Sequence, residues 1–287
     1  MSTTTLTLGA VAYDPKVITI WDGFRRWFGE RGLDFDYVLY TSYERQVAGH
    51  FRGEFTVAWN SPLAWLQTER VAARLGRAAR ALAMRDTDQD LTSVVVVRAD
   101  SAVRSLDDLR GRVVAVGAAD SPQATLLPLD HLAAAGLAAD RDVTVRRFDL
   151  LLGKHGDHVG GERDAARALA AGEVDAACLL DGNHLAFSRD GTLSPGGTRV
   201  LAQTAPYDHC CFTAVGPSDG PLLDRFVALL LAQRHADPAV RPLMDLEGLR
   251  EWRPGRTSGF APLARAIGRF GTVDAFVDAV VAEHGGR

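Results

Sequence analysis

The run LTSVVVVR, Leu91–Arg98, constrains the fold of this chain more than any other stretch. Four successive valines leave a strand without a polar face, so both sides of its sheet must be covered. Other strand patterns along the chain alternate with helical ones, as Thr5–Ala12 does with Val17–Glu30. This alternation predicts an α/β protein in which a mostly parallel sheet is covered by helices.

Length and charge set broad limits on function. With 287 residues, 47% of them hydrophobic and 24% charged, the chain has the composition of a globular protein with one large or two modest domains. Its net charge of −4 provides no general basic field for nucleic acid or anionic lipid. We therefore expect no nucleic-acid partner, whereas a local pocket for a small anion is compatible with this balance.

The N-terminal residues bear on localisation. MSTTTLTLGAVAYD contains no basic region followed by an apolar stretch and a small-residue cleavage site. No run of about 18 apolar residues, the length needed to span a bilayer, occurs in the sequence. We expect a cytoplasmic protein. A periplasmic protein or an extracellular lipoprotein is the alternative if a signal peptide has been removed.

Three segments resemble one known family. They are VVVRADSAVRSLDDLRGRVVAVGAADSPQAT (Val95–Thr125), GEVDAACLLDG (Gly172–Gly182) and GEFTVAWNSPLAWL (Gly53–Leu66). The most specific feature is SLDDLRG before a strand and a serine-bearing turn. Over nearly the whole chain, the pattern resembles the phosphate/phosphonate-type substrate-binding proteins of ABC transporters, within the type 2 periplasmic-binding-protein superfamily.

The resemblance implies a fold of two α/β lobes around a central cleft. Residues 1–93 and 206–287 are expected to form a discontinuous lobe 1, into which lobe 2, residues 94–205, is inserted. The implied function is the binding of a small anionic molecule in the cleft, one that bears a phosphonate, phosphate or carboxylate group. An ABC permease is the implied partner if the protein is exported.

Three turns follow expected strands, where ligands of open α/β sheets bind. They are Tyr13–Lys16, Trp59–Pro62 and Asp120–Thr125. The last resembles the oxyanion-binding loop of the family, in which N–H groups and a hydroxyl at a helix start face negative oxygens. The alternative is that Asp120 or Ser121 only caps a helix. The family usually has Ser/Thr-Gly at this turn, so Gln123-Ala124 argues against bare phosphate. The expected ligand-binding residues are Tyr13, Trp59, Asn60, Ser61, Ser121, Gln123, Thr125 and Tyr207.

Histidine, aspartate and cysteine gather in three further segments, GKHGDH, DGNH and DHCC. Imidazole, carboxylate and thiolate groups are ligands of zinc and iron, and glycine-containing loops let such groups converge. We expect these histidines to lie together beside the cleft, either as an iron or zinc site or as acid–base groups. Cys178 and Cys211 are instead expected to be small core residues. The candidate metal ligands are His155, His158, His184, His209 and Cys210.

One of these segments, HCCFTAV, is similar to the cysteine-rich CCCFC-like segment of the iron-dependent thiamin-pyrimidine synthase, an enzyme on the same fold. Only Cys210-Cys211-Phe212 match. The lysine that carries pyridoxal phosphate in that enzyme and its sacrificial histidine have no counterparts near Trp59–Leu66. The similarity therefore implies only that this fold can hold a metal near the segment.

Two functions remain open at this point. The overall pattern favours a ligand-binding protein that closes two lobes over its ligand. The density of histidines favours a cytoplasmic enzyme with its active site in the same cleft, either metal-dependent or with His209 or His158 as the catalytic general base. The sequence does not decide whether the protein is an enzyme.

Overall fold

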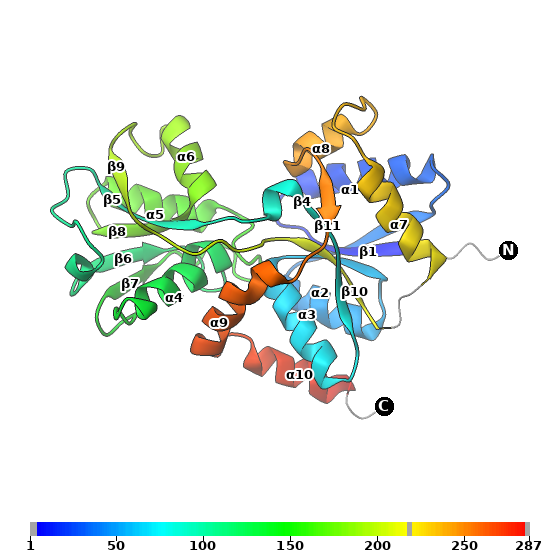
Figure 1. Cartoon of the computed structure of the whole chain (residues 1–287), viewed down its shortest axis with the longest axis horizontal. Helices are drawn as coiled ribbons and strands as arrows, with labels where there is room; N and C mark the ends of the chain where they lie inside the picture. The colour runs from blue at the N-terminus through cyan, green and yellow to red at the C-terminus, as the bar shows by residue number, and fades with distance from the viewer. Residues whose placement is uncertain (1–4, 217–219, 285–287) are drawn as a thin grey trace. The chain divides into compact units, whose positions relative to one another are not determined.

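The computed structural model describes residues 5–216 and 220–284. The chain forms two compact units (Figure 1). The first contains the described residues up to Gln89, then Asp208–Phe260, and those from Val273 onward. The second contains Asp90–Tyr207 and Ala261–Thr272. In the described ranges, no helix is both long and apolar enough to cross a membrane.

The first unit is built on a sheet with the strand order β11-β4-β10-β3-β1-β2. Helices α1, α7 and α8 lie over one face of this sheet, and α2, α3 and α10 lie over the other (Figure 1). Its strands are β1 (Leu6–Val11), β2 (Phe35–Tyr40), β3 (Val57–Asn60), β4 (Ala79–Arg85), β10 (Cys211–Val215) and β11 (Trp252–Pro254). Its helices are α1 (Lys16–Gly29), α2 (Tyr43–Arg52), α3 (Pro62–Arg74), α7 (Pro221–Ala232), α8 (Arg241–Glu247) and α10 (Asp274–His284), with short turns η1 (Asp86–Asp88) and η4 (Ser258–Phe260).

Aromatic residues fill the core of the first unit. The buried residues of α1 recur every three or four positions, which gives the helix one apolar face. From that face, Trp21 meets Phe212 of β10, whose ring centroid lies 4.6 Å from that of Trp59 on β3. The ring of Trp252 on β11 closes the group, 5.3 Å from Phe212. The core thus holds helix α1 against the middle of the sheet.

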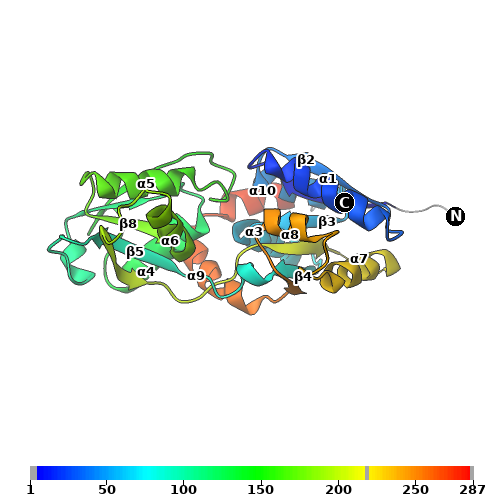
Figure 2. The same ribbon diagram turned by 90° about the horizontal axis from the view of Figure 1, so that it is seen from above.

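The second unit has the strand order β7-β6-β8-β5-β9. Helices α4 and α9 lie on one side of this sheet and α5 on the other, as Figure 2 shows. Its strands are β5 (Ser93–Arg98), β6 (Val113–Val116), β7 (Thr144–Arg147), β8 (Ala176–Leu180) and β9 (Thr198–Gln203). Its helical elements are η2 (Asp107–Leu109), η3 (Pro122–Leu126), α4 (Leu127–Ala134), α5 (Gly160–Ala170), α6 (Asp181–Arg189) and α9 (Ala261–Phe270).

Strand β5 is the valine run, and it is buried on both faces as the sequence predicts. Val95 and Val97 pack into a core with α4 residues, whereas Val94 and Val96 pack into a core with α5 residues. The prediction of a mostly parallel sheet is wrong. β5 runs antiparallel to both β8 and β9, and β10 of the first unit runs antiparallel to β3 and β4. An apolar run shows that a strand is covered but not the direction of its neighbours.

Helix α9 belongs to the second unit, whereas the predicted division assigns all of 206–287 to lobe 1. An ion-pair cluster connects α9 to α4 of that unit. Asp130 of α4 accepts hydrogen bonds from Arg265 Nε at 3.0 Å and Arg269 Nε at 2.6 Å, and both arginines lie on α9. The Asp130 side chain is only 2% exposed, so these arginines compensate a buried charge.

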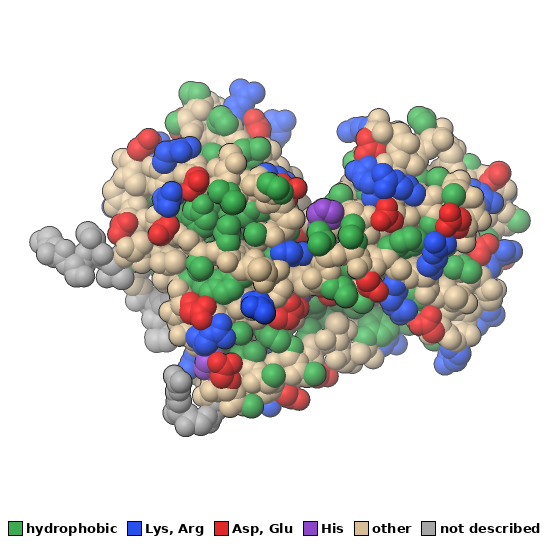
Figure 3. Space-filling view, turned by 180° about the vertical axis from the view of Figure 1, so that it is seen from behind, with side chains coloured by type: hydrophobic (Ala, Val, Ile, Leu, Met, Phe, Trp, Pro, Cys, Tyr) green, Lys and Arg blue, Asp and Glu red, His purple; other side chains and the backbone are tan. Residues whose placement is uncertain are grey.

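Charged side chains of both signs cover the surface. On the face drawn in Figure 3, Lys and Arg are interspersed with Asp and Glu, and no broad field of one sign is visible. This distribution agrees with the small net charge of the chain.

Candidate functional site

The Asp120–Thr125 turn of the second unit starts a helix. The side-chain oxygen of Ser121 accepts a hydrogen bond from the backbone N–H of Ala124 at 3.2 Å, and Pro122 takes the first helical position. Both are standard choices at a helix start, because a short acceptor satisfies a free N–H and proline loses none there. The short η3 then runs directly into α4. The helix start predicted from the sequence is therefore present.

This turn is buried and contains polar atoms without partners. Ser121, Gln123 and Thr125 are each no more than 3% exposed. Within the described part of the chain, the hydroxyl of Thr125 and the amide oxygen of Gln123 have no hydrogen-bond partner. Buried polar groups are nearly always hydrogen-bonded, so these unpaired atoms make the turn a candidate binding site.

The loop between β7 and α5 is fastened over the turn. Gln123 Nε2 donates to the carbonyl oxygen of Gly156 at 2.8 Å, and the N–H of Gly153 donates to Asp120 at 2.5 Å. His155 lies in the same loop, fully buried, with a left-handed φ of 50°. Burial also lowers the pKa of Lys154 in this loop. This loop, which covers the turn, therefore contains a histidine and a lysine.

Tyr207 is connected to the same turn through Ser93. The hydroxyl of Ser93 donates to the carbonyl oxygen of Gln123 at 2.5 Å and lies 2.9 Å from the hydroxyl of Tyr207. Since a serine has one hydroxyl proton, Tyr207 is the donor in the second bond. Burial raises the pKa of Tyr207, which keeps that proton in place. Tyr207 and Gln123, both predicted as ligand contacts, therefore belong to one network.

Glu162 is a candidate that the sequence analysis missed. It lies in the first turn of α5, where it accepts hydrogen bonds from Leu180 N at 2.6 Å and Asn183 Nδ2 at 3.0 Å. Burial raises its pKa to about 7. The only signal in the sequence is GGER before a helical pattern, which predicts an acid at a helix start but not its burial.

In the first unit, Asn60 and Ser61 form the end of β3 and the cap of α3. Asn60 Oδ1 accepts from Gln46 Nε2 at 2.8 Å, and Asn60 Nδ2 donates to Thr68 Oγ1 at 3.3 Å. Ser61 accepts from the N–H of Ala64 at 3.1 Å. Asn60 and Ser61 are fully buried. They form a preorganised polar group at the start of a long helix.

Two of the three predicted aromatic contacts, Trp59 and Tyr13, lie in or against the core of the first unit. Trp59 is 4% exposed, and the Arg85 guanidinium lies 5.2 Å from its ring centroid. Tyr13 is half-buried and packs against the same core. Their role as ligand-contacting walls stays a prediction.

The histidines do not form one group within either unit. His155, His158 and His184 belong to the second unit, and His209 belongs to the first. His158 Nδ1 accepts from the N–H of Gly160 at 3.1 Å. His184 lies on helix α6, where a loop was predicted, and its Nε2 is 2.9 Å from Thr198 Oγ1.

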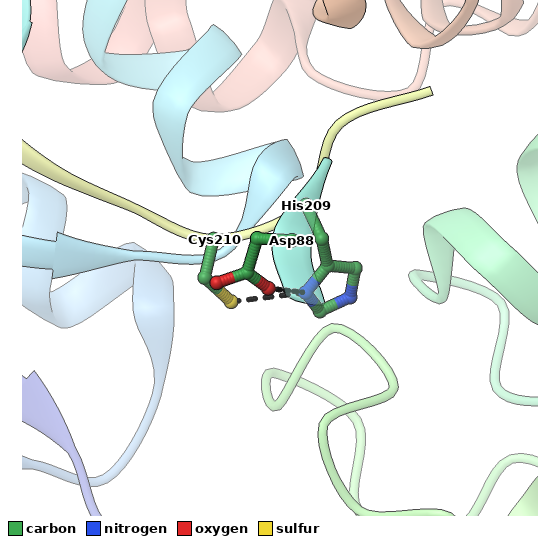
Figure 4. Close-up of side chains that lie close together, drawn as sticks. All are labelled: Asp88, His209 and Cys210. Carbon is green, nitrogen blue, oxygen red and sulfur yellow. Dashed lines mark hydrogen bonds and ion pairs between the residues drawn. The ribbon is translucent and has the colours of Figure 1, made fainter. Parts of the chain in front are cut away.

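His209 and Cys210 do lie together, and Asp88 of η1 joins them (Figure 4). His209 Nδ1 is 3.1 Å from Cys210 Sγ and 3.4 Å from Asp88 Oδ1. Asp88 was missed because its partners lie far along the chain. Of the predicted metal ligands, His209 and Cys210 thus lie together in the first unit, and a joint site with the other histidines stays a prediction.

A buried ion-pair network adjoins this cluster. Arg85 donates to both carboxylate oxygens of Asp88, at 2.6 and 2.8 Å, and to Glu247 at 3.1 Å. Burial acts to raise the pKa of Asp88, but the guanidinium of Arg85 outweighs it and lowers that pKa to about 2. Burial raises the pKa of Glu247, against the effect of Arg85. Cys178 and Cys211 are fully buried core residues, as predicted.

Comparison with known proteins places this geometry in a family. The family model described as "ABC transporter, phosphonate, periplasmic substrate-binding protein" matches residues 10–260. No curated protein sequence matches the chain.

Solved structures share the fold. PhnD1 from Prochlorococcus marinus (MIT 9301), in complex with methylphosphonate, has a TM-score of 0.69 and 14% identity over 94% of this chain and 99% of its own. A Xanthomonas citri protein bound to ATP has a TM-score of 0.66 and 20% identity over 96% and 98%. A binding-protein component of an ABC phosphonate transporter from Pseudomonas aeruginosa has a TM-score of 0.62 and 12% identity over 98% and 96%.

These matches confirm the two-lobed periplasmic-binding-protein fold predicted from the sequence. They also show that the prediction of a cytoplasmic protein is wrong, because the matched family is periplasmic. The chain belongs to the family of periplasmic substrate-binding proteins of phosphonate ABC transporters.

Proposed function

We propose that this protein binds a small phosphonate-bearing anion at the Ser121–Thr125 turn and presents it to the permease of an ABC importer. The observation that carries the proposal is the buried hydroxyl of Thr125, which has no partner within the described residues. A hydroxyl in this position is a ready hydrogen-bond donor to a phosphonate oxygen. Once an anion accepts that bond, the cost of the buried, unpaired group disappears.

The rest of the turn suits an anion. The N-terminus of the η3–α4 helix carries partial positive charge, which favours negative oxygens. Gln123 Nε2 and the hydroxyl of Tyr207 are held at fixed positions in the surrounding network. The methylphosphonate in the Prochlorococcus marinus relative supports this ligand class for our chain.

In the first unit we propose Asn60 and Ser61, at the start of α3, as ligand-contacting residues. The amide oxygen of Gln46 beside them has no hydrogen-bond partner in residues 5–216 and 220–284. Gln46 is itself fully buried, so a ligand group that donates a hydrogen bond to this oxygen would satisfy it.

The test is isothermal titration calorimetry with methylphosphonate as the probe. Thr125→Val keeps the shape of the side chain but removes its hydroxyl, and Ser121→Ala removes the cap that orders the turn. Each change should weaken binding by about 1–3 kcal/mol, or roughly 5- to 150-fold in Kd.

Ser194→Ala is the matched control, because Ser194 is an exposed serine of the same unit. It should leave the Kd unchanged. Methanesulfonate and ATP serve as competing probes, and weaker binding of both supports a phosphonate ligand. Full methylphosphonate affinity in Thr125→Val, or no binding by the unmodified protein, would overturn the proposal.

A further inference from the structure

We propose that Asp88, His209 and Cys210 form a binding site for a thiophilic divalent cation of the Zn²⁺ class in the first unit. A carboxylate oxygen, an imidazole nitrogen and a sulfur atom lie within 4.8 Å of one another there. Figure 4 shows the sulfur of Cys210 and the carboxylate of Asp88 directed toward the same nitrogen of His209. Sulfur, imidazole and carboxylate together are a typical ligand set for zinc.

The spacing of the three atoms suits a tetrahedral centre. Zinc bonds of about 2.3 Å to sulfur and 2.0–2.1 Å to nitrogen or oxygen place neighbouring ligand atoms about 3.3–3.6 Å apart. The observed separations are 3.1 Å from Cys210 Sγ to His209 Nδ1 and 3.4 Å from that nitrogen to Asp88 Oδ1. These two separations lie within about half an ångström of the tetrahedral values, and the third, between Cys210 Sγ and the Asp88 carboxylate, is at most 4.8 Å.

Backbone and side-chain contacts hold the ligands in place. The N–H of His209 donates to the carbonyl oxygen of Asp88 at 2.8 Å, which fixes η1 against the segment before β10. Arg85 holds the carboxylate of Asp88 through two hydrogen bonds. Such supporting contacts orient ligands at metal sites, and an oxygen bonded to arginine keeps a second lone pair for a metal.

The formal charges of the cluster favour the binding of a cation. Arg85 faces two buried carboxylates, those of Asp88 and Glu247, so the ionised trio carries one excess negative charge. A divalent cation bound with Cys210 as the thiolate brings the formal sum to zero. Asp88 and Cys210 are each 2% exposed and His209 is 8% exposed, so little water is available to compensate the charge.

The position of the cluster gives such a cation a structural effect. The chain leaves the first unit after Gln89 and returns to it at Asp208, and the three ligands lie next to these two points. A bound cation would therefore fasten both crossing segments together on their first-unit side. This structural role is separate from the binding of a ligand at the Ser121–Thr125 turn.

The direct test uses full-length protein without a histidine tag, freed of metal by a chelator and titrated with Co²⁺. We expect one equivalent to bind, with tetrahedral cobalt bands and a thiolate-to-cobalt charge-transfer band. One equivalent of Zn²⁺ should remove both signals. Absence of the thiolate-to-cobalt band in the unmodified protein would overturn the proposal, whatever the variants do.

Cys210→Ser and His209→Ala should each lower Zn²⁺ affinity at least about tenfold, measured by competition with a chelating dye. Cys211→Ser and Cys178→Ser are matched controls, because both cysteines are buried but neither belongs to the cluster. They should keep the full affinity. A Cys210→Ser protein that retains the thiolate-to-cobalt band would also overturn the proposal.

Discussion

Gln123 donates a hydrogen bond from its side-chain nitrogen to the carbonyl oxygen of Gly156, and this bond holds the loop before α5 against the start of η3. The approach is close because residue 156 is glycine. A Cβ atom at this position would lie 2.3 Å from Ser121 Oγ and 2.6 Å from Gln123 Nε2. The backbone there also has a φ of +77°, a conformation that favours glycine.

Gly156→Ala should therefore disturb both stability and ligand binding. The left-handed backbone costs the variant about 1–2 kcal/mol of unfolding free energy, and the clash with Ser121 displaces the loop or the turn. We expect a lower denaturation midpoint and weaker methylphosphonate binding by calorimetry. Gly191→Ala is the control, since Gly191 has a φ of +83° but a Cβ atom there would meet no other atom within 4 Å. Equal affinity losses in the two variants would contradict the role of the contact.

The sequence predicts well those elements whose formation depends on their own residues. Ser93–Arg98 is a strand because its valines suit only a covered sheet, and Ser121-Pro122 starts a helix because both residues satisfy its first turn. Strand β4 was not predicted, since ARALAMR contains no β-branched residue and gains its stability from its neighbours β10 and β11. Helix α6 was predicted as a loop because of the glycine in DGNH.

In the candidate site, too, local features could be predicted from the sequence, whereas contacts between distant segments could not. The cap of Ser121 and the burial of Cys178 could be predicted from local sequence and residue type. The burial of Glu162 depends on β8 and α6, and the contact of Asp88 with His209 depends on pairing between distant segments. No local pattern encodes such contacts. The expected gathering of histidines beside a cleft stays a prediction, because His155, His158 and His184 lie in a different unit from His209.

Removing the two arginines of α9 should destabilise the protein more than removing the aspartate of α4 with which they pair. Replacing Arg265 and Arg269 together by alanine leaves the buried carboxylate of Asp130 without its partners, at a cost of about 3 kcal/mol. Asp130→Ala leaves two arginines that are 59% and 42% exposed, at a cost of about 1 kcal/mol. Unfolding in urea measures both costs.

Combining the three substitutions should recover part of the loss seen in the double arginine variant, since no buried charge then remains. Arg167→Ala provides a control, because its pair with Asp164 is exposed on both sides and should contribute little. If Asp130→Ala proves as costly as the double arginine variant, the buried charge is not what holds α9.

Glu162 should make the second unit less stable as the pH rises from about 4.5 to 7. Burial raises its pKa in the folded protein to about 7 from an ordinary value of 4.5. Below pH 4.5 the carboxyl is protonated in both the folded and the unfolded state, so no charge is buried on folding. Between these values the unfolded chain ionises first, which favours unfolding by a total of about 3 kcal/mol.

Glu162→Gln should remove this dependence, because a glutamine keeps an acceptor for the N–H of Leu180 but carries no charge, and Asn183 can rotate its amide to match. Urea unfolding from pH 4.5 to 8 should show the stability of the unmodified protein falling relative to that of the variant. Glu173→Gln, at an exposed position of the same unit, should follow the unmodified protein instead. Parallel curves for Glu162→Gln and the unmodified protein would mean that Glu162 ionises without penalty. In that case water must stabilise the ionised carboxylate in the folded protein.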